Sequence, residues 1–133
     1  MAFDELKARL TATPILALPR DEGQYILDVD ASGEGLGAVL SQVQADEEKV
    51  IGYASRLCNR AEANYCITRR ELLALVYGLK QYRQYLLGRS FLIRTDHSAL
   101  QWLRSKKEPV GQHARWIDLV EQYDFTISTL CSV

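Results

Sequence analysis

Three acidic residues, Asp30, Glu71 and Asp96, occupy positions from which carboxylates could hold metal ions. Asp30 directly follows a run of β-prone residues, Tyr25–Val29. Asp96 likewise follows Phe91–Thr95, and Glu71 is predicted in the first turn of a long helix. Carboxylates gathered without histidine or cysteine favour hard cations such as Mg²⁺ or Mn²⁺. Two such ions, roughly 3.5–4 Å apart, would activate a water molecule and stabilise the leaving oxygen of a phosphodiester.

Only the fold can bring these acids together, because 41 residues separate the first pair and 25 separate the second. The strands that precede Asp30 and Asp96 would have to be parallel neighbours, with the intervening helix crossing their ends. A helical crossover between two strands of one sheet gives this arrangement. The helix is predicted with Thr68 as its N-cap and Gly88 as its stop. Its apolar stripe has spacings of 3 and 4 residues and consists of Leu72, Leu75, Val76, Leu79, Tyr82 and Leu86.

The remaining elements follow from hydrophobic periodicity and turn residues. Further strands are predicted over Leu36–Val43, Val50–Ser55 and Phe125–Leu130, and further helices over Phe3–Leu10, Ser98–Leu103 and Gln112–Gln122. Turns or loops are predicted at Asp21–Gly23, Gln44–Lys49 and Lys106–Gly111. This order indicates an α/β fold, in which three antiparallel strands and two parallel additions form a mixed five-stranded sheet with flanking helices.

Each acid also has a structural interpretation. Thr68 and Glu71 have the spacing of a capping box, and the pattern alone favours capping over metal binding for Glu71. Asp30 could start a turn, and Asp96 could cap the helix after it. The metal prediction therefore rests on the convergence of all three. Asp28 shares a strand face with Asp30 by the period of two, and we interpret it as a neighbour of the site rather than a ligand.

A glycine motif offers a different function. Gly33, Gly35 and Ala38 match the G-x-G-x-x-A fingerprint of dinucleotide-binding proteins. That fingerprint requires a helix to begin at the glycines, whereas Leu36–Val43 is predicted as a strand and is soon followed by the charged run 46–48. The sequence therefore argues against a dinucleotide site.

Composition and charge are compatible with a nucleic-acid partner without selecting one. The 133 residues suffice for one domain with a hydrophobic core. The net charge is −1, yet residues 59–115 carry 11 Lys and Arg against 4 Asp and Glu, so this segment is +7. A basic segment of this kind can contact phosphates, but a solvated helix face has the same composition.

No apolar run is long enough to span a bilayer, and the chain does not open with a secretion signal. Cys58, Cys66 and Cys131 form no CxxC pair, which favours free thiols in a reducing compartment. We therefore expect a cytoplasmic protein that is not secreted and that is small enough for nuclear access.

Several motifs occur together and in a fixed order between about Phe3 and Ile127. They are Leu27–Ser32, Gly35–Gln42, Ile51–Arg56, Asn64–Tyr65, Arg70–Ala74, Tyr85–Gly88, Thr95–His97, Leu100 and Trp102–Leu103. This set resembles the ribonuclease H (RNase H) domain of gypsy-class LTR retrotransposon polyproteins, whose reverse transcriptases are retroviral-like. The resemblance covers nearly the whole chain.

The resemblance implies an RNase H-like fold and a function in retroelement reverse transcription. Asp30, Glu71 and Asp96 would be three of the family's four catalytic carboxylates, and the cofactor would be Mg²⁺, with Mn²⁺ as an alternative. The reaction would be endonucleolytic hydrolysis of the RNA strand of an RNA–DNA hybrid, with water as the nucleophile. The partners would be the hybrid and the polymerase domain of the same polyprotein, and the enzyme would work in a cytoplasmic retroelement particle.

Nucleic-acid contacts are predicted at five positions in this framework. They are Ser32, Arg56, Arg69, Arg70 and Arg94. Recognition of a hybrid would also require contacts to RNA 2′-hydroxyl groups across the minor groove. His97 and His113 are predicted to be structural, because the resemblance gives His97 no ligand role.

The chain departs from the family pattern at its C-terminal end. In the family, a Pro-Gly loop and a final helix with the fourth catalytic aspartate follow the fifth strand, whereas no acid follows Asp124 here. We therefore expect residues 1–20 to be a connector resembling the polymerase–RNase H junction, and 21–133 to be a C-terminally truncated RNase H-like domain. The alternative function is a catalytically weak or inactive fragment that acts as a structural or nucleic-acid-binding module.

Overall fold

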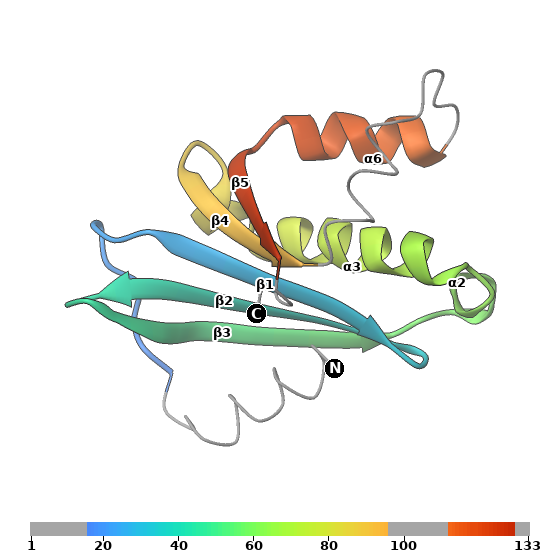
Figure 1. Cartoon of the computed structure of the whole chain (residues 1–133), viewed down its shortest axis with the longest axis horizontal. Helices are drawn as coiled ribbons and strands as arrows, with labels where there is room; N and C mark the ends of the chain where they lie inside the picture. The colour runs from blue at the N-terminus through green and yellow to red at the C-terminus, as the bar shows by residue number, and fades with distance from the viewer. Residues whose placement is uncertain (1–15, 96–111, 130–133) are drawn as a thin grey trace.

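A mixed five-stranded sheet with the strand order β3-β2-β1-β4-β5 forms the centre of the structure. The computed structural model describes residues 16–95 and 112–129. The strands are β1 (Tyr25–Ser32), β2 (Gly35–Gln44), β3 (Glu47–Leu57), β4 (Ser90–Thr95) and β5 (Asp124–Thr129). β1, β2 and β3 pair antiparallel, whereas β4 is parallel to β1 and β5 is parallel to β4 (Figure 1). The predicted mixed sheet is confirmed.

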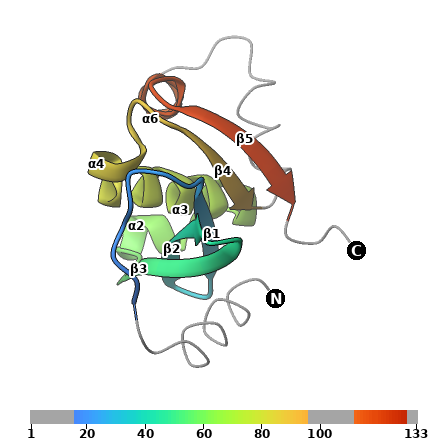
Figure 2. The same ribbon diagram turned by 90° about the vertical axis from the view of Figure 1, so that its left-hand side faces the viewer.

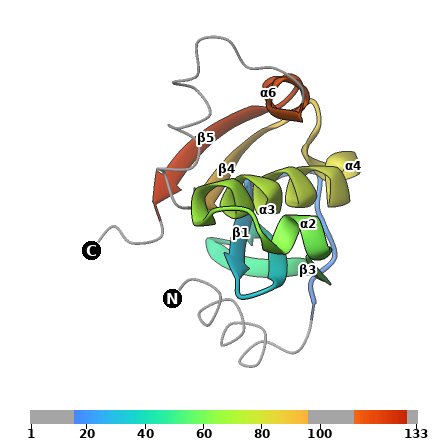
Figure 3. The ribbon, with the colours of Figure 1, turned by 90° about the vertical axis from the view of Figure 1, so that its right-hand side faces the viewer.

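The described helices are α2 (Arg60–Ala63), α3 (Ile67–Gln81), α4 (Arg83–Leu86) and α6 (Gln112–Glu121). The long helix α3 packs on β1 and β2, and α6 lies beside it on the same side of the twisted sheet (Figures 2 and 3). Buried side chains from both helices and from the facing sides of the strands form one core, which includes Leu27, Leu40, Leu72, Leu79, Phe91 and Trp116. No helix in the described ranges is long and apolar enough to cross a membrane.

The start of the long helix differs from the prediction. The N-cap is Cys66 rather than Thr68, and its side chain makes no capping hydrogen bond. Glu71 therefore lies beyond the first turn, and its predicted capping box with Thr68 is wrong. A capping box forms instead at α2, where Asn59 and Glu62 bond reciprocally. Four residues are too few to show an apolar period, so the capping-box spacing of Asn59 and Glu62 is the sequence signal for α2.

The predicted helix is interrupted near its C-terminal end. Tyr82 has φ −113° and ψ 24°, so the helical backbone stops there and resumes as α4. The apolar stripe nevertheless continues across the break, because Leu79 and Leu86 are both fully buried. Gly88 has φ +83°, the left-handed conformation expected of a glycine after a helix.

The predicted turn over Gln44–Lys49 is shorter in the structure. Strand pairing extends to Gln44 and Glu47, which leaves only Ala45 and Asp46 in the turn. Both have positive φ, 54° and 63°, the conformation whose twist matches that of paired antiparallel strands. Side-chain periodicity did not reveal this extension, because charged residues occupy the start of β3.

Predictions on the remaining segments lie outside the described residues. They are the helices over Phe3–Leu10 and Ser98–Leu103 and the loop over Lys106–Gly111. In the part of the chain that the structure describes, Cys58 and Cys66 are free thiols.

At Gly78, α3 lies very close to the sheet. A Cβ atom at this position would lie 2.8 Å from Cγ1 of Val29 and 3.2 Å from Cβ of Ala38. Gly78→Ala is therefore expected to destabilise the domain by about 1–2 kcal/mol, since overpacking outweighs the gain in helix propensity. Chemical denaturation measures this loss. Gly35→Ala is the matched control, because a Cβ there would make only ordinary contacts, the nearest at 3.6 Å; equal stability of the two variants would contradict the expectation.

Candidate active site

The strand directions bring the ends of three elements to one end of the sheet. β1 and β3 both run antiparallel to β2, so they end on the same side. The chain then passes through α2, and α3 begins near the tips of β1 and β3 (Figure 1). β4 runs parallel to β1 and ends in the same direction. This is the arrangement that the predicted metal site requires.

Two of the three predicted metal ligands lie on these elements. Asp30 lies near the end of β1, two residues beyond Asp28, which pairs with Arg94 of β4. Glu71 lies close to the start of α3. Asp96 follows the last residue of β4 in the sequence, but it lies outside the described residues. The topology thus supports the convergence of Asp30 and Glu71 at one end of the sheet.

The chemistry of these two side chains fits a hard divalent cation. Both are half-buried, and the Oδ2 atom of Asp30 is shielded from solvent. Carboxylate oxygens are the ligands that Mg²⁺ and Mn²⁺ prefer. Within residues 16–95 and 112–129, no group of three or more His, Cys, Asp or Glu residues forms a complete site.

Next to Asp30 on the same strand face, Asp28 forms a buried ion pair. Its carboxylate is completely buried, and its two oxygens accept hydrogen bonds of 2.7 Å each from Nε and Nη2 of Arg94. Arg94 also donates to Glu48 of β3, with Nη1 3.3 Å from Oε2. Burial lowers the pKa of Arg94, but the bonds and charges of Asp28 and Glu48 outweigh this effect and raise it. Two carboxylates therefore engage an arginine that was predicted to contact nucleic acid.

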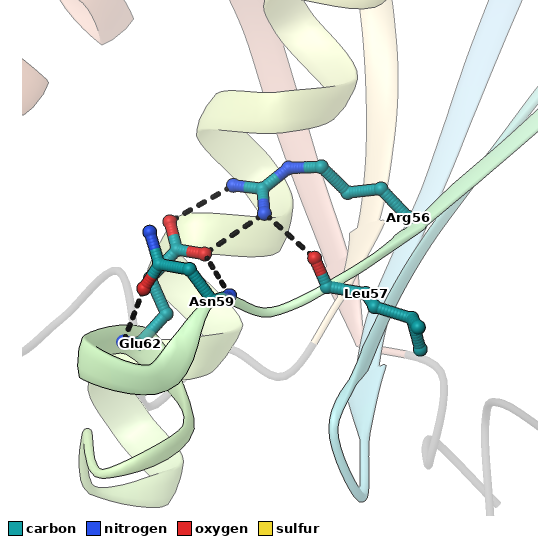
Figure 4. A network of polar contacts seen from close by, with 4 residues as sticks. All are labelled: Arg56, Leu57, Asn59 and Glu62. Atoms are coloured by element: carbon teal, nitrogen blue, oxygen red, sulfur yellow. Dashed lines mark hydrogen bonds and ion pairs between the residues drawn. The ribbon is translucent and has the colours of Figure 1, made fainter.

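Arg56, at the end of β3, is held in a similar way (Figure 4). Its Nη1 and Nη2 atoms lie 2.8 Å and 3.0 Å from the two carboxylate oxygens of Glu62, and Nη1 also donates to the carbonyl of Leu57. Its guanidinium lies over the ring of Tyr77, 5.6 Å from the centroid. Glu62 simultaneously accepts from the backbone amide of Asn59, so one carboxylate joins β3 to the start of α2.

This network predicts a pH dependence. The hydrogen bond from Arg56 lowers the pKa of Glu62 below 4.5, partly offset by burial and assisted by the amide of Asn59. A carboxyl group whose pKa is lower in the folded state contributes stability above its unfolded pKa, and this stability is lost as the pH falls through the folded pKa. We expect Glu62→Gln to be less stable than the wild type near neutral pH, with the difference shrinking in acid. Unfolding curves between about pH 7 and about pH 3 measure this; a constant difference would contradict it.

The other predicted nucleic-acid contacts lie at the same end of the sheet. Ser32 is the last residue of β1. The Cζ atom of Arg69 lies 3.9 Å from the ring centroid of Tyr65 and 5.9 Å from that of Trp116. Arg70 donates through Nη1 to the carbonyl of Gly33. The sequence did not indicate the contacts of Arg69 and Arg70. The partner of Arg56 is different, because the spacing of Asn59 and Glu62 is a capping-box signal that could have been recognised.

The sheet order and the helices on it define an RNase H-like fold. A foamy viral protease–reverse transcriptase in complex with dsDNA matches 98% of this chain and 28% of its own, with a TM-score of 0.72 and 18% identity. LC11-RNase H1 in complex with RNA/DNA hybrid matches 80% of this chain and 85% of its own, with a TM-score of 0.55 and 11% identity. At these identities the likeness shows the fold alone.

Sequence comparison shows the family. Residues 20–123 match the model of the RNase H-like domain found in reverse transcriptase. The chain is also 45% identical, over 126 residues and 95% of its length, to the retrovirus-related Pol polyprotein from transposon 297 of Drosophila melanogaster. The chain therefore belongs to the RNase H-like domains of reverse transcriptases, and the predicted resemblance to retrotransposon polyproteins is confirmed. It spans 12% of the length of that polyprotein.

Proposed function

We propose that this domain hydrolyses the RNA strand of RNA–DNA hybrids endonucleolytically, with divalent metal ions, during reverse transcription of a retroelement. The observation that carries the proposal is the position of Asp30 and Glu71, from β1 and α3, at one end of a sheet of this family. One solved protein of the same fold supports the substrate class, because LC11-RNase H1 was captured with RNA/DNA hybrid.

Asp30, Glu71 and Asp96 would hold Mg²⁺, or Mn²⁺ in its place. The bound ions would supply Lewis acidity toward the attacking water and the leaving oxygen. The protein's contribution is to hold the carboxylates on rigid elements: Asp30 within a paired strand, and Glu71 on a helix that packs against the core. Such preorganisation reduces the reorganisation required when charge develops in the transition state.

Ser32 and Arg69 are the remaining candidates for contacts with the nucleic-acid backbone, since they lie at this end of the fold and Arg70 donates to the carbonyl of Gly33. Arg56 and Arg94 are already engaged by carboxylates, so the proposal does not depend on them. The polymerase domain of the same polyprotein is the proposed protein partner, in keeping with the polyprotein relative.

A cleavage assay tests this function. The purified chain would be incubated with a labelled RNA–DNA hybrid, and with duplex DNA and duplex RNA of the same sequence, in Mg²⁺, Mn²⁺ or EDTA. We expect the protein to cleave the RNA strand of the hybrid and neither duplex, and to do so in Mg²⁺ or Mn²⁺ but not in EDTA. Absence of cleavage by folded protein would contradict the enzymatic proposal. Retained hybrid binding would then favour the alternative, a nucleic-acid-binding module.

A further inference from the structure

Two consecutive arginines at the start of α3 point to different partners. Arg69 lies over the ring of Tyr65, which precedes the helix. Arg70 instead donates through Nη1 to the backbone carbonyl of Gly33, 37 residues away in the turn between β1 and β2. Its Nε atom is shielded from solvent, and the side chain as a whole is half-buried. The hydrogen bond directs the guanidinium of Arg70 toward this turn.

The turn that Arg70 contacts is otherwise lightly packed. Gly33 has φ +58°, and a Cβ at this position would meet no atom within 4 Å. The backbone carbonyl of Glu34, the second turn residue, accepts a hydrogen bond of 2.6 Å from the backbone amide of Cys58, which directly follows β3. The turn is thus anchored from β3 through the backbone and from α3 through the side chain of Arg70.

The bond from Arg70 joins the two elements that carry the proposed metal ligands. Arg70 directly precedes Glu71, and Gly33 follows Asp30 by three residues. We propose that Arg70 is a positioning residue that fixes the separation of Asp30 and Glu71, rather than a contact to the nucleic-acid backbone. The inference rests on the proposed function. If the carboxylates hold catalytic metal ions, a displacement of about 1 Å can lower the reaction rate by about a hundredfold.

The two roles of Arg70 predict different measurements. A phosphate contact contributes counterion release, so its loss would weaken hybrid binding. It would also reduce by about one the salt slope, which is the slope of the logarithm of the binding constant against the logarithm of the salt concentration. A positioning role predicts an unchanged salt slope in metal-free buffer. It also predicts greater mobility of the turn and a weaker affinity for Mn²⁺, by about tenfold, as for other groups that orient metal ligands.

Arg70→Met is the test, with Lys80→Met as the matched control. Each removes one positive charge from α3, but Lys80 is an exposed residue of the last turn. Backbone ¹⁵N relaxation of residues 32–35 reports the mobility of the turn on the ps–ns timescale. Paramagnetic broadening by Mn²⁺ reports metal affinity, and binding of a metal-free hybrid over a range of salt reports phosphate contacts.

We expect only Arg70→Met to increase turn mobility and weaken Mn²⁺ binding, with the salt slope of both variants equal to that of the wild type. Unchanged mobility and unchanged Mn²⁺ affinity would overturn the inference, as would a lower salt slope for Arg70→Met. Absence of Mn²⁺ binding by the wild type would instead count against the proposed function, while the relaxation data would still test the anchor.

A second variant serves if Arg70→Met does not fold. Arg70→Lys keeps the charge but replaces the rigid guanidinium fork with a flexible ammonium group. We expect a wild-type salt slope and a turn that is more mobile than in the wild type. A turn as rigid as that of the wild type, with unaltered Mn²⁺ affinity, would overturn the positioning role.

Discussion

Arg94→Met is expected to lower the free energy of unfolding by about 3–5 kcal/mol, because it leaves a buried carboxylate without its cation. Asp28 is 0% exposed, and both of its oxygens accept from Arg94 at 2.7 Å. Loss of Arg94 removes two hydrogen bonds and a positive charge from this buried carboxylate, which costs free energy.

Equilibrium denaturation of Arg94→Met and of two comparison variants measures this effect. Glu48→Gln changes the other partner of Arg94. The Glu48 side chain is 30% exposed, so this variant is expected to lower the free energy of unfolding by less than about 1.5 kcal/mol. The double variant Asp28→Leu with Arg94→Met removes both charges and is expected to recover most of the loss. If Arg94→Met alone lowered the free energy of unfolding by less than about 1 kcal/mol, the Asp28–Arg94 pair would stabilise the fold no more than an exposed salt bridge does.

Asp30→Asn is expected to reduce metal-dependent cleavage of the hybrid by about a hundredfold or more. Asparagine keeps the size of the side chain but removes the negative charge that a divalent cation requires. Loss of several kcal/mol of transition-state stabilisation from the metal corresponds to at least two factors of ten in rate. The domain is expected to remain folded.

Initial rates of RNA cleavage, measured with Mg²⁺ and with Mn²⁺, test this expectation. Asp118→Asn is the matched control, because Asp118 is exposed on α6, far along the chain from the ends of β1 and β4. A fall of less than about tenfold in a folded Asp30→Asn protein would show that Asp30 is not a ligand essential for the reaction. Equal losses in both variants would point to a general effect of charge.

The sequence by itself determined most of the fold. Runs of β-prone residues identified the central strands, and the apolar stripe from Leu72 to Leu86 identified the helix that packs on them. These patterns are visible because a strand buried on both faces has a continuous apolar run, whereas burial of one face gives a helix a period of about 3.6. The same patterns located Asp30 and Glu71 at the ends of elements, and the crossover rule then predicted that those ends share one side of the sheet.

Only the tertiary structure decided which arginines are available to a ligand. Arg94 is engaged by Asp28, 66 residues away, and Arg70 by Gly33, 37 residues away. It also decided that the helix begins at Ile67, so that Glu71 is not a capping residue. The physical reason is that apolar burial repeats along the chain and is therefore visible locally. The partner of a charged side chain depends instead on which distant strands and turns the fold brings within hydrogen-bonding distance.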